Sequence, residues 1–222
     1  MARHLIAAVL ILGSCQGIAY ADEPFERIKV FLEQNVQDKD AEFKIEATGG
    51  KGGLTSLQVK APDGRTVIDF KAPDSKLGMR TVLLESPEPT NDGSVQADFP
   101  AGAYTFSGRS ASGERLEGTA MLSHVFPDPT AFIQPRPEAT NVPHKRLMLN
   151  WRAVKGLAAY VVVIEQESSG REIRANLPAN ATSFNVPDGF LLPNTEYKLA
   201  IGTVARNGNS SFIETAFTTA RK

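Results

Sequence analysis

The C-terminal half of the chain, from Pro127 onward, is built of short segments in which apolar and polar residues alternate. A period of two places every second side chain on the same face, which is typical of a half-buried β-strand. Turn sequences such as Asn207-Gly208 separate the segments. About seven strands of this kind, with no helical period between them, predict a β-sandwich. The apolar positions of three segments are Leu147, Leu149 and Trp151, then Tyr160, Val162 and Ile164, then Tyr197, Leu199 and Ile201.

One motif within this half predicts a particular corner of the sandwich. Leu191-Leu192-Pro193-Asn194-Thr195-Glu196-Tyr197 has the pattern L-x-P-x-T-x-Y, and its tyrosine opens a strand. In a tyrosine corner the phenol forms a hydrogen bond with the main chain a few residues upstream. We therefore expect Leu191, Pro193 and Tyr197 to be structural residues rather than parts of a ligand site.

With these features, residues 129–220 resemble a fibronectin type III domain. Members of that family bury a tryptophan on the second strand and a tyrosine on the third, and Trp151 and Tyr160 occupy the matching positions. The last hairpin, at Asn207-Gly208-Asn209-Ser210, also matches. The resemblance implies that Trp151 and Tyr160 pack in the core and do not form an exposed binding platform.

The preceding segment, residues 22–126, also alternates, for example at Ile28, Val30 and Leu32. Pro62-Asp63-Gly64 has the composition of a tight turn. These patterns predict a second sandwich, of the immunoglobulin-like type. The glycine-rich stretch at residues 49–53 is expected to be a flexible loop, and no Gly-Lys-Ser/Thr sequence makes it a phosphate-binding loop.

The two predicted domains, 22–126 and 127–222, meet at Phe126-Pro127-Asp128-Pro129. Because proline restricts both its own φ and the conformation of the residue before it, this linker is expected to be short and stiff. The predicted fold is therefore all-β, with two tandem antiparallel β-sandwiches after a cleaved signal peptide.

The later part of the first domain contains the string Phe99-Pro100-Ala101-Gly102-Ala103-Tyr104-Thr105-Phe106-Ser107-Gly108-Arg109, followed by Leu116-Glu117-Gly118 and Leu122-Ser123-His124. Coupled to a fibronectin type III domain, this order resembles secreted proteins of Gram-negative bacteria that have no assigned activity. The resemblance implies an architecture and a compartment. It gives no residue a catalytic role.

The first 21 residues predict an export signal. The apolar run Leu5–Leu12 follows two basic residues and is far shorter than the roughly 20 residues that span a bilayer. Small residues at Ala19 and Ala21 place the cleavage site between Ala21 and Asp22. Cleavage there predicts a secreted or periplasmic protein.

A second interpretation of the same segment stays open. Leu12-Gly13-Ser14-Cys15 resembles a bacterial lipobox, in which Cys15 is lipid-modified and becomes the new N-terminus. This processing would make the protein a membrane-anchored lipoprotein.

Composition excludes several classes of activity. Lys and Arg number 24 against 25 Asp and Glu, a formal net charge of −1, so no overall basic field attracts a nucleic acid. A single cysteine excludes an intrachain disulfide framework. The sequence has no Gly-x-Ser-x-Gly elbow for a serine nucleophile. His124 is expected to bond to the neighbouring domain and His144 to be solvated, so neither is predicted to be catalytic, and no cofactor is expected.

A weak candidate for a metal site is formed by Asn35, Asp38 and Asp40, which lie in the first loop between strands. Calcium prefers such oxygen ligands but usually takes six or more of them. We therefore expect a solvated turn that binds calcium weakly or not at all.

Taken together, these features predict a non-enzymatic exported protein that binds or scaffolds in the bacterial envelope or outside the cell. Sandwiches present loops and edge strands while their cores stay closed, so a protein or a glycan is the expected partner. The alternative is an accessory carbohydrate- or substrate-binding module of a secreted hydrolase system. An exposed strip of aromatic side chains would favour that alternative.

The signal interpretation gives a direct prediction. The purified native protein should begin at Asp22 and be recovered in the soluble envelope fraction, because the predicted cleavage removes the only cysteine. N-terminal mass spectrometry checks this. A chain that begins with diacylglyceryl-modified Cys15 would contradict it and place the protein on a membrane surface.

Overall fold

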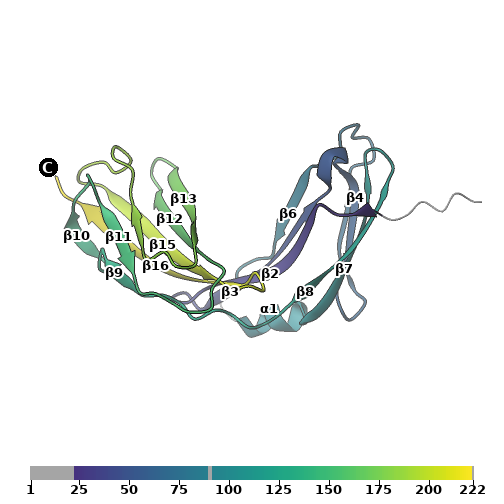
Figure 1. Ribbon diagram of the computed structural model, residues 1–222, viewed down its shortest axis with the longest axis horizontal. Coiled ribbons are helices and arrows are strands. Elements are labelled where there is room, and N and C mark those ends of the chain that lie inside the picture. Colours follow the sequence, from purple (N-terminus) through teal and green to yellow (C-terminus); the bar gives the residue numbers. More distant parts are fainter. Residues whose placement is uncertain (1–22, 90–91, 222) are drawn as a thin grey trace, which may run out of the picture.

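The computed structural model describes residues 23–89 and 92–221, so the predicted processing sites at Cys15, Ala21 and Asp22 lie outside the described residues. Two β-sandwiches lie at the two ends of an open arc, with the short helix α1 below them (Figure 1). The elements are β1 (Glu23–Pro24), β2 (Arg27–Asn35), β3 (Asp40–Thr48), β4 (Leu54–Lys60), β5 (Thr66–Lys71), β6 (Thr81–Glu85), α1 (Asp92–Asp98), β7 (Gly102–Ser110), β8 (Arg115–Leu122), β9 (Phe132–Gln134), β10 (Ala139–Val142), β11 (Met148–Trp151), β12 (Ala159–Gln166), β13 (Arg171–Pro178), β14 (Ser183–Asn185), β15 (Glu196–Val204) and β16 (Ser210–Thr219).

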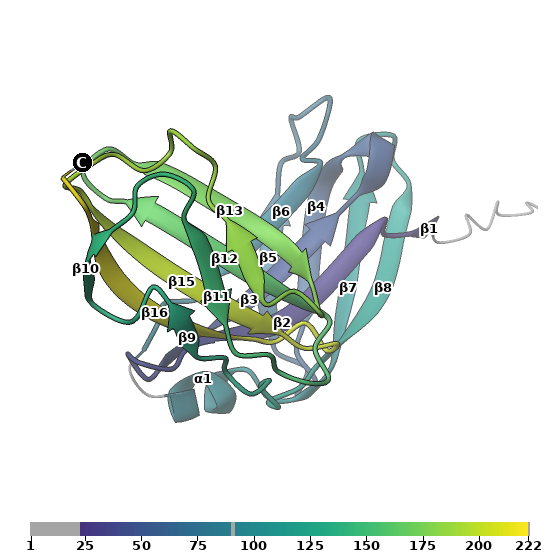
Figure 2. The ribbon, with the colours of Figure 1, turned by 60° about the vertical axis from the view of Figure 1, so that its left-hand side comes forward.

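The C-terminal domain has two layers (Figure 2). β9, β11 and β14 form one layer, and β13, β12, β15 and β16 form the other in that order. Without the short β10, the strands follow along the chain as β9, β11, β12, β13, β14, β15 and β16. The first, second and fifth of these form one layer, and the third, fourth, sixth and seventh form the other. This is the strand order of the fibronectin type III fold, so the predicted fold of this domain is confirmed.

The N-terminal domain has the same strand order. β2, β3 and β6 form its three-stranded layer, and β5, β4, β7 and β8 form its four-stranded layer. In each domain a short strand also pairs in parallel with the last strand, β1 with β8 and β10 with β16. The prediction of two sandwiches in an all-β chain is therefore confirmed, and the two domains prove to be built alike.

Aromatic side chains fill the core of the C-terminal domain. Trp151, Tyr160 and Tyr197 are buried, as their inward phase predicts. The rings of Trp151 and Tyr160 lie 5.6 Å apart, and Tyr197 stacks on Phe217 at 5.7 Å. Each polar atom has a partner: Trp151 Nε1 donates to the Ala181 carbonyl at 3.1 Å, and Tyr160 Oη accepts from the amide of Val154 at 2.7 Å. Burial of these rings therefore leaves no polar group unsatisfied.

The tyrosine corner of the C-terminal domain lies at the start of β15. Tyr197 Oη accepts a hydrogen bond from the Leu192 amide at 2.8 Å and donates to the Phe190 carbonyl at 3.4 Å. Leu191 is buried and Pro193 is exposed at the bend. The hydroxyl thus links the sixth strand to the segment that precedes it.

A second tyrosine corner, in the N-terminal domain, was missed by the sequence analysis. Tyr104 is fully buried near the start of β7, and its hydroxyl donates to the Pro100 carbonyl at 3.1 Å. Burial raises the pKa of Tyr104 to about 12. The signal was present, because Pro100 precedes Tyr104 by four residues, as Pro193 precedes Tyr197.

One local prediction was wrong, that His124 bonds to the neighbouring domain, and one helix was missed. The flexibility expected of residues 49–53 stays a prediction; in the structure Gly50–Gly52 forms a 3-10 turn, and a Cβ atom at Gly53, whose φ is 58°, would overlap the Leu77 carbonyl oxygen. The helix α1 was not predicted, since its seven residues are too few for a helical period to be visible. His124 bonds within its own domain, where Nε2 lies 2.8 Å from the Phe99 carbonyl oxygen.

The two corners give a stability prediction. Tyr197→Phe should cost about 1–3 kcal/mol, because it leaves the Leu192 amide without its partner. Tyr104→Phe should cost less, about 0.5–1.5 kcal/mol, because it removes one hydrogen bond to a carbonyl. Trp151→Ala should cost about 3–5 kcal/mol through the cavity it leaves. Urea titrations of the three variants measure these values, and negligible losses for both Tyr197→Phe and Trp151→Ala would contradict the core assignment.

Candidate functional site

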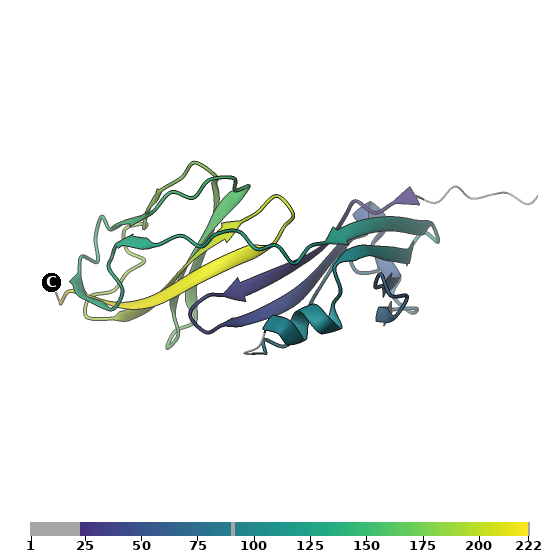
Figure 3. The ribbon, with the colours of Figure 1, turned by 90° about the horizontal axis from the view of Figure 1, so that it is seen from below.

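The two sandwiches are joined by a shared sheet rather than by a linker alone. The end of β2 pairs in parallel with the start of β16, with Glu33 opposite Ser210 and Asn35 opposite Phe212. The amide of Val36 adds a bond of 3.0 Å to the Phe212 carbonyl. One continuous sheet therefore runs from β13 through β16 and β2 to β6 and crosses the domain junction (Figure 3).

Asn209 lies at the centre of the junction and is fully buried. Its Oδ1 accepts from the Leu32 amide at 2.9 Å, and its Nδ2 donates to the carbonyls of Ser123 and Val125 at 2.8 and 3.0 Å. One side chain of the C-terminal domain thus binds both the first strand of the N-terminal domain and the segment that connects the domains.

The connecting segment is held along its length by the C-terminal domain. Ser211 Oγ donates to the Pro127 carbonyl at 2.8 Å, and Thr203 Oγ1 donates to the Asp128 carbonyl at 3.0 Å. Both hydroxyl residues are buried. These bonds attach the connecting segment to the C-terminal domain.

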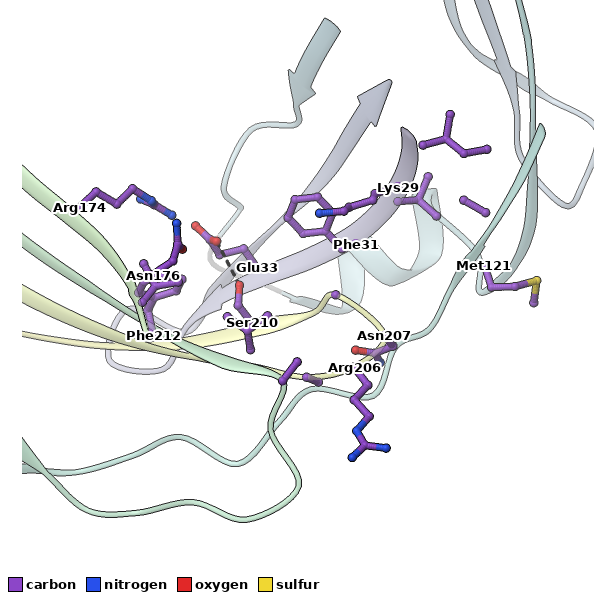
Figure 4. Close-up of a pocket in the computed structure, with 18 of the residues that line it drawn as sticks. Lys29, Phe31, Glu33, Met121, Arg174, Asn176, Arg206, Asn207, Ser210 and Phe212 are labelled. Carbon is purple, nitrogen blue, oxygen red and sulfur yellow. Dashed lines mark hydrogen bonds between the residues drawn. The ribbon is translucent and has the colours of Figure 1, made fainter. Parts of the chain in front are cut away.

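On the concave side of this junction the outer faces of the two sandwiches enclose a cleft (Figure 4). Its main part has a volume of about 600 Å³, and hollows of about 340 and 470 Å³ share residues with it. Lys29 and Phe31 project into it from β2, and Arg174 and Asn176 from β13 (Figure 4). The cleft is therefore formed by strands of both domains.

Arg174 lines all three hollows, and Phe212 lines two of them. The Arg174 guanidinium lies over the Phe212 ring, 6.0 Å from its centre. The ring in turn lies against Gly202, where a Cβ atom would come within 2.5 Å of it. A glycine at position 202 thus lets the aromatic ring lie flat on β15 beneath the arginine.

One end of the cleft is strongly acidic. Among the described residues that line the 340 Å³ hollow, one is basic, Arg174, and the carboxylates are Glu33, Asp38, Asp40, Glu42, Glu88, Glu165, Glu172 and Glu214. Burial raises the pKa of Glu214, and the charge of Asp38 adds to this rise. The hollow therefore has a local negative potential in a chain whose net charge is close to zero.

The weak metal candidate lies at this acidic end. Asn35 Nδ2 donates to Asp38 Oδ2 at 2.9 Å, and Asn35 Oδ1 accepts from the Gln37 amide at 3.0 Å. Asp40 lines the same hollow. Within residues 23–89 and 92–221, no three His, Cys, Asp or Glu side chains are grouped so that they could hold a metal ion. The expectation of weak or no calcium binding stays a prediction.

Lys44 lies in the wall that the N-terminal domain contributes. Its ammonium is 2.7 Å from Glu42, 3.1 Å from Glu33 and 3.2 Å from Glu85. Burial opposes its charge, but the hydrogen bond to Glu42 and the charge of Glu33 raise the pKa of Lys44 above its ordinary value. Burial also raises the pKa of Glu42, although Lys44 opposes this. Three carboxylates around one ammonium leave this wall negative.

The two described histidines lie away from the cleft. Of the described histidines, His124 is bonded to a main-chain carbonyl and His144 lies half-buried in a turn between β10 and β11. Neither lines the cleft.

In the part of the chain that the structure describes, no helix has the length and apolar character needed to cross a membrane.

Comparison with protein families finds no matching family model. Among solved structures, the fibronectin(III)-like modules of CbhA from Clostridium thermocellum align over 87% of this chain and 94% of that one, with 9% identity and a TM-score of 0.36. A two-domain fibronectin type III segment of chicken tenascin aligns over 89% and 100%, with 13% identity and a TM-score of 0.34. A tetra-tandem repeat of a large adhesion protein aligns over 88% of this chain and 50% of that one, with 12% identity and a TM-score of 0.33. The fold assignment rests on the strand order of each domain.

The Lys44 cluster gives a pH-dependent prediction. Lys44→Met should cost about 1–3 kcal/mol at pH 7, less than for a fully buried pair because Glu85 is half exposed. Burial already raises the pKa of Glu42, and loss of the Lys44 ammonium removes the interaction that opposes this rise. The deficit should therefore shrink as the pH falls from about 7 to about 4.5 and Glu42 becomes protonated.

Urea titrations at both pH values measure the deficit. Lys198→Met is the matched control, because Lys198 is exposed and pairs with the exposed Glu167. The control should change stability by less than about 1 kcal/mol at either pH. A Lys44→Met deficit that does not depend on pH would show that packing, and not charge, is what Lys44 supplies.

Proposed function

We propose that this protein is an exported, non-enzymatic binding module that holds an extended, basic segment of a partner protein in the cleft between its two sandwiches. The observation that carries the proposal is the cleft itself, whose two walls come from different domains and are held at a fixed angle by buried hydrogen bonds. A site that is formed before its ligand arrives avoids the entropic cost of ordering it. The sequence of residues 1–21 supports export.

The choice of a protein partner over a glycan rests on the aromatic residues. Every aromatic side chain in the described part of the chain is buried or half-buried, including Trp151 and all three described tyrosines. The exposed aromatic strip that would favour a carbohydrate-binding accessory module is therefore not seen among these residues. Charged side chains beside apolar ones line the cleft, and these suit a polypeptide.

The choice of a basic segment rests on the distribution of charge. The carboxylates of the acidic end are spread over strands of both domains and are not gathered about one point. Spread charges match a chain of several cations better than a single ion, and they add to specificity and to the rate of association. Because Arg174 lines the cleft, the segment can also contain an acidic or neutral residue opposite its guanidinium.

A defined probe tests the proposal. A labelled octalysine peptide should bind the full chain, and its binding should weaken as salt is added because the attraction is electrostatic. Glu172→Lys, at an exposed position in the acidic end, should raise the dissociation constant about three- to tenfold. Fluorescence anisotropy measures both effects, with an octaglutamate peptide as the reference probe.

Glu196→Lys is the matched control. Glu196 is equally exposed and begins β15, but it does not line the cleft, so the same change of net charge should leave the dissociation constant unaltered. Equal effects of the two substitutions, or equal binding of the two peptides, would overturn the proposal.

A further inference from the structure

β6 forms the open end of the sheet that crosses the domain junction, and β3 is its only paired neighbour among the described strands. The amide of Gly49 bonds to the Arg80 carbonyl, and the amide of Ser86 bonds to the Phe43 carbonyl. In an antiparallel pair the bonded residues alternate, so Val82 and Leu84 direct their main-chain groups to β3. Thr81, Leu83 and Glu85 therefore direct theirs outward, where a further strand would pair.

Exposed apolar side chains gather at this edge. Of the ten large hydrophobic residues that are exposed in the described part of the chain, four lie between residues 77 and 84. Leu83 is 55% exposed and Leu77 is 85% exposed. Apolar side chains beside free main-chain groups are the features that edge strands usually avoid, because they invite pairing.

Two other edge strands of similar length carry charges along their length. β13 contains Arg171, Glu172 and Arg174, and β5 contains Asp69 and Lys71. β6 has a single charged residue, Glu85, at its last position. Charge protects the other two edges against pairing and leaves β6 open.

The charges that flank β6 are arranged so that the edge complements itself. Lys76 and Arg80 precede the strand, and Glu85 and Glu88 end or follow it. All four are exposed, and no ion pair joins Lys76, Arg80 or Glu88 to another described residue. When two copies meet antiparallel about Leu83, Thr81 faces Glu85, and the basic flank of each copy lies beside the acidic flank of the other.

We propose that β6 is the interface of a symmetric homodimer, in which the β6 strands of two copies pair antiparallel about Leu83 and join their sheets into one. A two-fold axis brings the same surface of both copies together, which is what a self-complementary edge requires. The inference goes beyond the proposed function, because it concerns the open edge of the sheet and not the ligand in the cleft. Leu83 and Glu88 also line hollows of the cleft, so self-association is measured directly and is not inferred from octalysine binding.

The full chain, with its N-terminus established by mass spectrometry, tests the inference. Sedimentation equilibrium from micromolar to submillimolar concentration should show a reversible monomer–dimer equilibrium. Hydrogen exchange should slow at the amides of Thr81, Leu83 and Glu85 as concentration rises, while the amides of β5 should not change. A monomer at every concentration, or protection at another surface, would overturn the proposal.

Charge-reversal variants test the antiparallel register. Arg80→Glu and Glu88→Arg should each raise the dissociation constant about tenfold or more, since each places like charges beside one another. An equimolar mixture of the two variants should recover dimers. Arg80→Glu makes both ends of its β6 more acidic, Glu88→Arg makes both ends of its β6 more basic, and the two therefore attract each other. Circular dichroism confirms that each variant is folded. Dimers that survive Leu83→Lys, or a mixture that associates no better than either variant alone, would refute this pairing.

Discussion

The side-chain amide of Asn209 is the interaction on which the shape of the molecule most depends. Its buried side chain accepts a hydrogen bond from one main-chain amide of the first domain and donates to two carbonyls of the connecting segment. A change in the angle between the domains would strand some of these groups, and each stranded group costs about 1–3 kcal/mol. The joining strands pair over only three residues, so the polar contacts around Asn209 add substantially to the junction. The walls of the cleft come from the two domains that meet there.

The acidic end of the cleft combines carboxylates from both domains, so neither domain has this cluster of charge alone. Glu33 comes from the first domain and Glu214 from the second, and both line the same hollow. The hydroxyl of Ser210 donates to Glu33 at 3.0 Å, so one of these carboxylates is also tied into the junction. Burial raises the pKa of Glu214, and the charge of Asp38 adds to this rise. A cationic ligand would reduce the repulsion between these carboxylates.

The local sequence pattern predicts the two domains well, but it does not predict the pairing of β2 with β16 that joins them. Alternation placed Leu149 and Tyr160 in the core, and the turn at Asn207-Gly208 was recognised because its residues suit a hairpin. The pairing of β2 with β16 joins residues 177 positions apart, as the bond between Leu32 and Asn209 shows, and no local spacing reports it. Asn209 was noticed only as part of a hairpin sequence, since its role depends on a strand of the other domain. For the same reason Asn35, Asp38 and Asp40 were considered as one loop, whereas the structure adds carboxylates from β3, β12, β13 and β16.

Most open edges of the sheets are covered, short or charged. In each domain the last strand would leave its outer edge open, and a short parallel strand covers part of it, β1 on β8 and β10 on β16. β2 covers the remaining end of β16, so the domain junction is itself a form of edge protection. β9 and β14 are three residues long, and charges occupy β5 and β13. Among the described strands, β6 has neither a covering strand nor charges along its length. An exposed apolar edge strand invites pairing with another strand, and the other edges of this protein are protected against it. The exception at β6 therefore favours a partner strand there.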